Sequence, residues 1–230
     1  MRRLALIGGT SWLSTVDYYR NVNRLVNERL GGMEFPELLL YSVNFGDLKR
    51  NTDAGDQVAN GRIFVDAAMR LKAAGAEGIL LCANTPHLFA EEVEAATGLP
   101  VVHIGTATAE AVREAGITRA ALLGTRLTME LEFIRSKLLA KGIEPLVPER
   151  EADREWVHQT IFNELGRGEL TDHLRGRYLA LIDDLAQRGA EGVVLACTEI
   201  PLLLSPEQIP MPSFDTTMIH SLAAVEFILG

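Results

Sequence analysis

Cysteine and basic charge are both scarce in this chain of 230 residues. Its two cysteines, Cys82 and Cys197, are too few for a disulfide framework and are typical of a cytoplasmic protein. The formal net charge of −9 leaves no basic excess to meet phosphates, so we expect neither nucleic acid nor an anionic membrane as a partner. No stretch approaches the length of a membrane span. A small acidic substrate is still possible, because a local pocket can be positive on an acidic protein.

Nucleotide and cofactor motifs are missing as well. Gly8-Gly9 does not extend into G-x-G-x-x-G and the chain has no Walker A pattern, which argues against a bound nucleotide. Cys82 and His87 alone make a poor zinc site, because no third ligand is near. No lysine ends a predicted strand, which argues against a Schiff base with pyridoxal phosphate; the lysines are Lys49, Lys72, Lys137 and Lys141. We therefore expect neither a metal nor a cofactor.

Short apolar runs alternate with longer amphipathic segments along the chain. The runs are apolar throughout, which is typical of strands that are covered on both faces in a parallel sheet with crossover helices. The first run ends at Gly8-Gly9 and is too short for a signal peptide, so we interpret it as a strand. The pattern predicts an α/β fold with strands over 3–7, 37–43, 78–82, 101–104, 120–123, 144–147, 192–196 and 211–214.

The first helix is predicted over residues 15–30. Ser14 or Thr15 is a suitable N-cap, and Gly31-Gly32 should end the helix. The apolar stripe that would face the core consists of Tyr19, Val22, Val26 and Leu30.

An internal repeat is the most informative feature of the sequence. The segment GAEGILL at 75–81 recurs as GAEGVVL at 189–195, an offset of 114 residues, or about half the chain. The predicted strand segments ALIG at 5–8 and ALLG at 121–124 are similar and lie 116 residues apart. Pro100, Ile104 and Thr106 match Pro210, Phe214 and Thr216 at an offset of 110. Three copies in the same order predict duplication of a four-stranded unit.

The duplication predicts two similar Rossmann-like subdomains, each with a four-stranded parallel sheet. The first subdomain would contain residues 1–105 and a C-terminal helix over 216–230, and the second residues 106–215. Ligands of such sheets bind outside the carboxyl ends of the strands. We therefore expect the residues that follow matched strands to converge on an active site in the cleft between the subdomains.

Small, hydroxyl and amide residues follow four of the predicted strands. They lie at helix N-termini, where unsatisfied N–H groups can bind a carboxylate without help from lysine. Each loop alone could be an ordinary N-cap, but the four together favour a polar anion pocket. Its predicted residues are Thr10 and Ser11, Asn84 and Thr85, Thr125, and Thr198 with Glu199.

Cys197 is the strongest single candidate for a catalytic residue. It directly follows a buried strand and precedes a predicted helix start, where N–H groups would stabilise a thiolate, the form that acts as base or nucleophile. An inert buried cysteine is the alternative. In the register of the repeat, Ala83 matches Cys197 and Cys82 matches Ala196. Because neighbouring side chains of a strand point to opposite faces, we expect Cys82 to face the packing between sheet and helix.

Other polar residues are weaker candidates. Lys49, Arg50 and Arg167 lie in loop-like segments, where one of them could bind the distal group of a substrate. Each is more often a solvated surface charge. His87 either orients a carboxylate or caps a helix.

These motifs, in this order, resemble the aspartate/glutamate racemase family through nearly the whole chain. The segments that carry the resemblance are 8–12, 84–87, 122–126, 161–165, 196–200 and 214–216. The resemblance implies two α/β subdomains, a homodimer, and racemisation of a small-molecule amino acid without a cofactor. In that mechanism one thiolate removes the Cα proton and a second thiol returns a proton on the opposite face. Carried over, Cys197 is the base from the second half, and the α-carboxylate is held by Asn84, Thr85, Thr125 and Thr198.

The sequence departs from the family pattern at Ala83, where the family has its N-terminal cysteine directly before Asn-Thr. Three hypotheses follow. The loop shifts so that Cys82 reaches the cleft; or a water or a hydroxyl such as Thr85 replaces the missing acid and gives a slow or one-sided racemase; or the protein catalyses a one-base reaction or only binds ligand. Thr10 and Leu13 stand where relatives often carry methionine and glutamate. This difference argues against strict specificity for acidic substrates.

The sequence thus predicts an enzyme that racemises or epimerises an amino acid, aspartate/glutamate-like or broader, by thiol-mediated proton transfer at Cα. A one-thiol decarboxylase or a cis–trans isomerase is the alternative chemistry on the same fold. A non-catalytic protein that binds an amino acid or a dicarboxylate is the alternative from a different class.

Overall fold

A computed structural model describes residues 1–230, which divide into two compact units. Unit 1 contains Met1–His103 and His220–Gly230, and unit 2 contains Ile104–Ile219. Each unit has its own four-stranded sheet, and every strand pair is parallel. The predicted fold class, two similar α/β subdomains with four-stranded parallel sheets, is confirmed.

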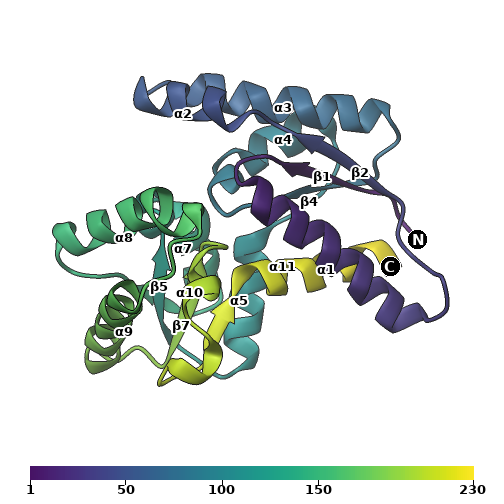
Figure 1. The fold of residues 1–230 in the computed structure, drawn as a ribbon. Helices are drawn as coiled ribbons and strands as arrows, with labels where there is room; N and C mark the ends of the chain where they lie inside the picture. The colour runs from purple at the N-terminus through teal and green to yellow at the C-terminus, as the bar shows by residue number, and fades with distance from the viewer. The chain divides into compact units, whose positions relative to one another are not determined.

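Unit 1 carries the sheet β2-β1-β3-β4. Its strands are β1 (Leu4–Gly8), β2 (Leu38–Ser42), β3 (Gly78–Leu81) and β4 (Val101–Val102). Helices cover both faces of the sheet (Figure 1), and for this reason the residues of β1 and β3 are buried throughout. One face packs on α1 (Trp12–Leu30) and the C-terminal α11 (Thr216–Leu229), and the other on α2 (Phe45–Asp53), α3 (Gln57–Ala73), the 3₁₀ helix η1 (Thr85–Phe89) and α4 (Ala90–Thr97).

Unit 2 repeats this arrangement with the sheet β6-β5-β7-β8. Its strands are β5 (Arg119–Gly124), β6 (Glu144–Leu146), β7 (Gly192–Ala196) and β8 (Ser213–Asp215). One face packs on α5 (Ile104–Glu114) and α7 (Glu132–Ala140), and the other on α8 (Glu151–Asn163) and α9 (Asp172–Gln187). The shorter elements are α6 (Arg126–Glu130), η2 (Leu165–Arg167), α10 (Ile200–Leu203) and η3 (Pro206–Gln208).

The two repeated segments are built in the same way, which confirms the duplication. In unit 1 the Glu77 carboxylate accepts the backbone N–H of Arg3 at 2.7 Å, and in unit 2 the Glu191 carboxylate accepts that of Arg119 at 3.2 Å. The backbone N–H of each glutamate in turn donates to the carbonyl of the same arginine. A strand order shared by both sheets and an identical brace between matched residues indicate two copies of one unit.

The repeat register needs one correction near the last strand. The Ile79 N–H donates to Pro100 O at 2.9 Å, and the matched Val193 N–H donates to Pro212 O at 2.9 Å. Pro100 therefore corresponds to Pro212, and the predicted match to Pro210 is wrong. Several prolines precede β8, and sequence identity alone cannot choose among them, whereas the hydrogen bond to the neighbouring strand does.

Helix α1 begins earlier than predicted. Its N-cap is Ser11, whose hydroxyl accepts the Ser14 N–H at 3.3 Å, so Ser14 and Thr15 lie inside the first turn instead of capping it. The helix ends at Leu30, and Gly31 is its C-cap, as predicted. The predicted apolar stripe is half wrong, because Tyr19 and Leu30 are exposed while the buried apolar residues are Tyr18, Val22 and Val26.

Two predicted strands differ from the structure by two residues at one end. Strand β4 ends at Val102, because Ile104 already begins α5. Strand β8 begins at Ser213, after the two prolines of the Ile-Pro-Met-Pro segment, which lack the N–H groups that a sheet needs.

Gly9 fixes the path of the chain after β1. Its φ is 93°, and a Cβ there would lie 2.1 Å from the carbonyl oxygen of Val43. We expect Gly9→Ala to lower the free energy of unfolding by about 3 kcal/mol, through left-handed strain and a clash with fixed backbone. Gly98→Ala is the matched control: its φ is also positive but no atom lies within 4 Å, so the cost should be about 1 kcal/mol. Urea unfolding measures both, and equal losses would contradict the clash.

Candidate active site

The loops after β1 and β3 lie at the same edge of the unit 1 sheet, because the two strands are parallel neighbours. The Cys82 N–H donates to Ile7 O at 2.9 Å, and the Ser14 hydroxyl donates to Cys82 O at 2.7 Å, which ties the two loops together. This edge carries four of the predicted site residues, namely Thr10, Ser11, Asn84 and Thr85.

Those four residues differ in how they are used within unit 1. Ser11 is the N-cap of α1, which occupies its hydroxyl. Asn84 is the N-cap of η1 but makes no side-chain capping bond, and Thr85 is the first residue of that helix. The Thr10 hydroxyl is buried without a hydrogen-bond partner. A buried hydroxyl in that state costs free energy, so Thr10 would gain from a bound polar ligand.

Cys82 lies in the core of unit 1, where its register places it. Its side chain is 1% exposed and packs in the cluster that contains Tyr18, Val22 and Leu80. Burial raises the pKa of the Cys82 thiol far above its ordinary value. A thiol in this setting stays protonated and is a poor base.

In unit 2 the loops after β5 and β7 likewise share one edge. Gly124 pairs with Ala196 in the parallel register, so Thr125 and Cys197 follow at the same level. Thr125 is the N-cap of α6, and its hydroxyl accepts the Thr128 N–H at 3.4 Å. A Cβ on Gly124 would lie 2.7 Å from the Ala196 carbonyl oxygen, so this position requires glycine for the close approach of the two strand ends.

A thiol and a carboxylate meet at the end of β7. The Cys197 Sγ–H donates to Glu199 Oε2 at 2.9 Å, and the Thr198 hydroxyl donates to the same oxygen at 2.7 Å. Glu199 is only 8% exposed, while Cys197 is partly exposed. Sequence reasoning placed all three residues here, but it assigned Glu199 to a cap or to the substrate and not to the thiol.

The N–H groups that the sequence predicts would stabilise a thiolate of Cys197 are present, but stronger effects act on this thiol. Burial, the charge of Glu199 and its hydrogen bond to the thiol raise the pKa of Cys197 well above its ordinary value. The backbone N–H groups of Thr198 and Glu199 lower that pKa but are outweighed. Helix α10 begins only at Ile200 and has four residues, so it supplies little dipole to the sulfur. The resting form is a thiol whose proton points at a carboxylate.

A buried tyrosine also lies close to this pair. The Tyr178 hydroxyl is 2.9 Å from the Thr160 hydroxyl, and burial raises the pKa of Tyr178, with further contributions from the charges of Cys197 and Glu199. No sequence spacing links Tyr178 or Thr160 to Cys197, so sequence reasoning missed them. Only the packing of α8 and α9 on one face of the sheet brings them here.

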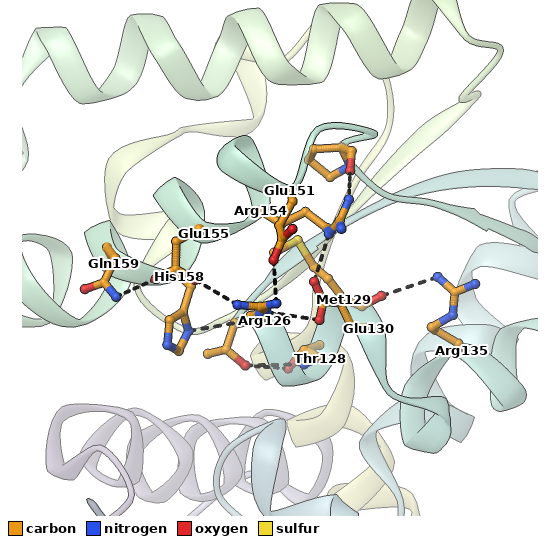
Figure 2. Close-up of polar contacts among 12 residues, drawn as sticks. Arg126, Thr128, Met129, Glu130, Arg135, Glu151, Arg154, Glu155, His158 and Gln159 are labelled. Atoms are coloured by element: carbon orange, nitrogen blue, oxygen red, sulfur yellow. Dashed lines mark hydrogen bonds and ion pairs between the residues drawn. The ribbon is translucent and has the colours of Figure 1, made fainter. Parts of the chain in front are cut away.

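Arg126, the residue after Thr125, is the centre of an ion-pair network (Figure 2). Its guanidinium contacts the carboxylates of Glu130, Glu151 and Glu155 at 3.1, 2.8 and 3.4 Å. Its backbone N–H donates to Nδ1 of His158 at 3.3 Å. These contacts tie α6 to α8 and hold the start of the Thr125 loop. They also pair the charge of the guanidinium that directly follows Thr125.

Two of the other basic candidates are occupied in a similar way. Within α2, Lys49 pairs with Asp53 at 2.7 Å and Arg50 pairs with Asp47. Arg167 lies in η2 and no ion pair places it near the strand ends. No group of three or more histidine, cysteine, aspartate or glutamate side chains could hold a metal ion, and no helix is long and apolar enough to cross a membrane.

The chain thus has a duplicated α/β fold with polar loops at matched strand ends, and a thiol lies beside a carboxylate at one of them. The chain belongs to the Asp/Glu/Hydantoin racemase family, whose model matches residues 7–224. It is 23% identical over 215 residues to the broad specificity amino-acid racemase RacX of Bacillus subtilis, and the match covers 94% of this chain and 90% of RacX.

Solved structures agree with the family. A putative Asp/Glu racemase from Yersinia pestis is 42% identical with a TM-score of 0.93, and the match covers 100% of both chains. An aspartate racemase homologue from Pyrococcus horikoshii is 33% identical with a TM-score of 0.85, again over 100% of both chains. A mutant of arylmalonate decarboxylase, at 15% identity and a TM-score of 0.55 over 100% of this chain and 94% of its own, shares the fold alone.

The link between Glu199 and the thiol can be measured directly. Because the charge and the hydrogen bond of Glu199 raise the pKa of Cys197, Glu199→Gln should shift the onset of Cys197 alkylation by iodoacetamide to lower pH. Cys82 is buried and should stay unmodified. Glu207→Gln is the control, since that exposed carboxylate in η3 has no contact with the thiol and should leave the profile in place. Identical profiles for Glu199→Gln and wild type would rule out the coupling.

Proposed function

We propose that the protein racemises amino acids without a cofactor and that Cys197 takes the proton from Cα. The observation that carries this proposal is the hydrogen bond from the Cys197 thiol to the buried carboxylate of Glu199 at the end of β7. A thiol with a raised pKa needs a partner that accepts its proton before it can act as a base. Glu199 is that partner in position and in orientation.

The proton transfers balance in three steps. Glu199 accepts the Cys197 proton, the thiolate then removes the Cα proton to regenerate the thiol, and a group on the opposite face of Cα protonates the carbanion. The proton left on Glu199 and the proton lost by the opposite group are restored through solvent. The Thr198 hydroxyl, which donates to the same Glu199 oxygen, holds the carboxylate in place while it changes charge.

The α-carboxylate of the substrate is the group that the polar strand ends would bind. Thr10, Asn84 and Thr85 in unit 1, with Thr125 and Thr198 in unit 2, offer hydroxyl, amide and backbone N–H donors. Fixed donors of this kind also stabilise the negative charge that develops when Cα loses its proton. Ser11 and the Thr198 hydroxyl are engaged within the protein, so their share would come from backbone N–H groups.

The family resemblance and the repeat, which match Ala83 to Cys197, suggest the loop after β3 as the source of the group on the opposite face of Cα. Ala83 takes the place of Cys197 in the repeat, and its methyl group cannot transfer a proton. Cys82 is held in the core and would have to leave its packing to reach a substrate. We therefore favour a water or the Thr85 hydroxyl as the proton donor, which makes the racemase slow or one-sided. The subdomain bounds that the sequence predicts, 1–105 with 216–230 and 106–215, stay part of this proposal.

Broad specificity, including neutral amino acids, is the substrate range that we propose. Lys49, Arg50 and Arg126 are each paired with a carboxylate of the protein, which argues against a role for them in binding a second carboxylate of aspartate or glutamate. The relative from Bacillus subtilis is named a broad specificity racemase. A cytoplasmic homodimer is the form that the family resemblance implies.

Exchange of the Cα hydrogen with deuterium from solvent tests the roles of the two residues. With a panel of L- and D-amino acids, we expect Cys197→Ser to lower the exchange rate by about 10³-fold and Glu199→Gln by about 10²-fold, because a positioned acid or base contributes that much. Cys82→Ala, which copies Ala196 of the repeat, should keep the rate. Full exchange in Cys197→Ser would refute the base assignment, loss in Cys82→Ala would favour the shifted loop, and binding without exchange would favour a non-catalytic protein.

Ala83→Cys tests the one-sided reaction. A thiol at this position would restore a proton donor in the loop that matches Cys197, so exchange of the slower enantiomer should rise by about 10-fold or more. The rate for the faster enantiomer should change much less, because Cys197 already serves it. Separate rates for the L and D forms, measured by proton NMR in deuterated water, make the comparison. An unchanged rate for both enantiomers would show that residue 83 does not face the reacting carbon.

A further inference from the structure

Three histidines of unit 1 gather beneath the loop that follows β3. The His87 ring lies 4.8 Å from that of His103 and 5.2 Å from that of His220, measured between ring centroids. Tyr18 of α1 packs edge-on against His220 at 5.4 Å. His87 and His220 are almost fully buried, at 2% and 0% exposure. The proposed mechanism uses none of these four side chains.

Hydrogen bonds assign the position of the proton on two of the rings. Nε2 of His220 lies 2.6 Å from the carbonyl oxygen of Val102, so it must carry a hydrogen, and Nδ1 then accepts the Tyr18 hydroxyl at 2.8 Å. Nδ1 of His87 lies 2.9 Å from the carbonyl oxygen of Ala83 and 3.2 Å from that of Asn84. Two carbonyl acceptors at one nitrogen require that Nδ1 of His87 also carries a hydrogen.

The surroundings keep His87 neutral. The groups that face it are His220 from α11 and His103 from the junction of β4 and α5, with Tyr18 of α1 behind His220. Burial lowers the pKa of His87 well below its ordinary value, and the positive charges that His220 and His103 could carry lower it further. Burial also lowers the pKa of His220 to about 3. His87 is therefore a neutral donor with a fixed tautomer across the physiological range.

The two carbonyl groups that His87 holds belong to the residues that begin the loop. The Ala83 N–H turns back to Leu81 O at 2.9 Å, so the chain reverses sharply directly after β3. The His87 backbone N–H donates to Asn84 O at 3.1 Å, and its side chain adds a second bond to that oxygen and one to Ala83 O. His87 thus fixes the loop from four residues further along the chain, with the other histidines packed against its ring.

We propose that His87 is a positioning residue, whose Nδ1–H holds Ala83 and Asn84 so that Asn84 and Thr85 meet the substrate carboxylate in one orientation. This inference rests on the proposed function, because the loop matters only if it binds the substrate. His87 itself touches no reacting atom. Misplacing a binding group by about 1 Å is enough to cost on the order of 100-fold in rate, so a small release of the loop should be visible in the kinetics.

Two variants at one position separate positioning from packing. His87→Asn keeps an N–H donor where Nδ1 lies, while His87→Leu keeps apolar bulk and loses the donor. We expect kcat/KM for Cα exchange to fall about 10- to 100-fold in His87→Leu and to stay within about threefold of wild type in His87→Asn. Tyr18→Phe is the control for damage to the cluster, since it removes the hydroxyl bound to His220 and leaves His87 bonded to the loop. It should lower the melting temperature and keep kcat/KM.

Amide hydrogen exchange tests the same anchor without a substrate. The amides of residues 83–85 should exchange at least about 10-fold faster in His87→Leu than in wild type or His87→Asn, because exchange follows local opening. If the wild-type protein exchanges no Cα hydrogen of any amino acid but the amide rates of the variants are as expected, the proposed function is refuted. The inference that His87 holds the loop would then still stand. Equal amide rates in the two His87 variants, or equal kcat/KM in His87→Leu and wild type, would overturn the positioning role.

Discussion

The parallel pairing of the two central strands in each unit decides where every candidate residue lies. β1 pairs with β3 and β5 with β7, so the loops that follow them leave the sheet at one edge and at one level. Gly124 permits this closeness in unit 2, since any side chain there would meet the Ala196 carbonyl. Residues that are more than 70 positions apart in sequence, Thr125 and Cys197 among them, become neighbours through register alone.

The chemistry of Cys197 follows from burial more than from the helix that comes after it. A sulfur partly sheltered from water and next to a carboxylate keeps its proton, and the same carboxylate offers the way to remove it. In the proposed mechanism one residue would thus both suppress the thiolate in the resting protein and release it when the substrate binds. His87 of unit 1 likewise has two roles. Its side chain bonds to the backbone of the loop after β3, and its ring is buried.

Much of the fold could be predicted from the sequence, because buried strands and glycine turns leave local patterns and the repeat adds a second copy of each. The register that pairs Ala83 with Cys197 came from five identities in seven residues. The predictions that were wrong or missing concern features that depend on contacts between distant parts of the chain. Tyr18 and not Tyr19 is buried because Tyr18 lies on the side of α1 that packs against α11. Pro212 is the match of Pro100 because its carbonyl accepts the N–H of Val193. Neither the Glu199 contact nor the three histidines has a spacing signature, since they depend on side-chain direction and on α11 returning to unit 1.

The duplicated strands end in the same two residue types in opposite order, Cys82-Ala83 in one unit and Ala196-Cys197 in the other. A dimer made from two separate copies of a single unit would have to carry the same dipeptide twice. Fusing the copies into one chain removes that symmetry, and each half can then diverge without altering its twin. The inverted pair shows such a difference: the Cys82 side chain is buried in the core of unit 1, and Cys197 is partly exposed directly after β7.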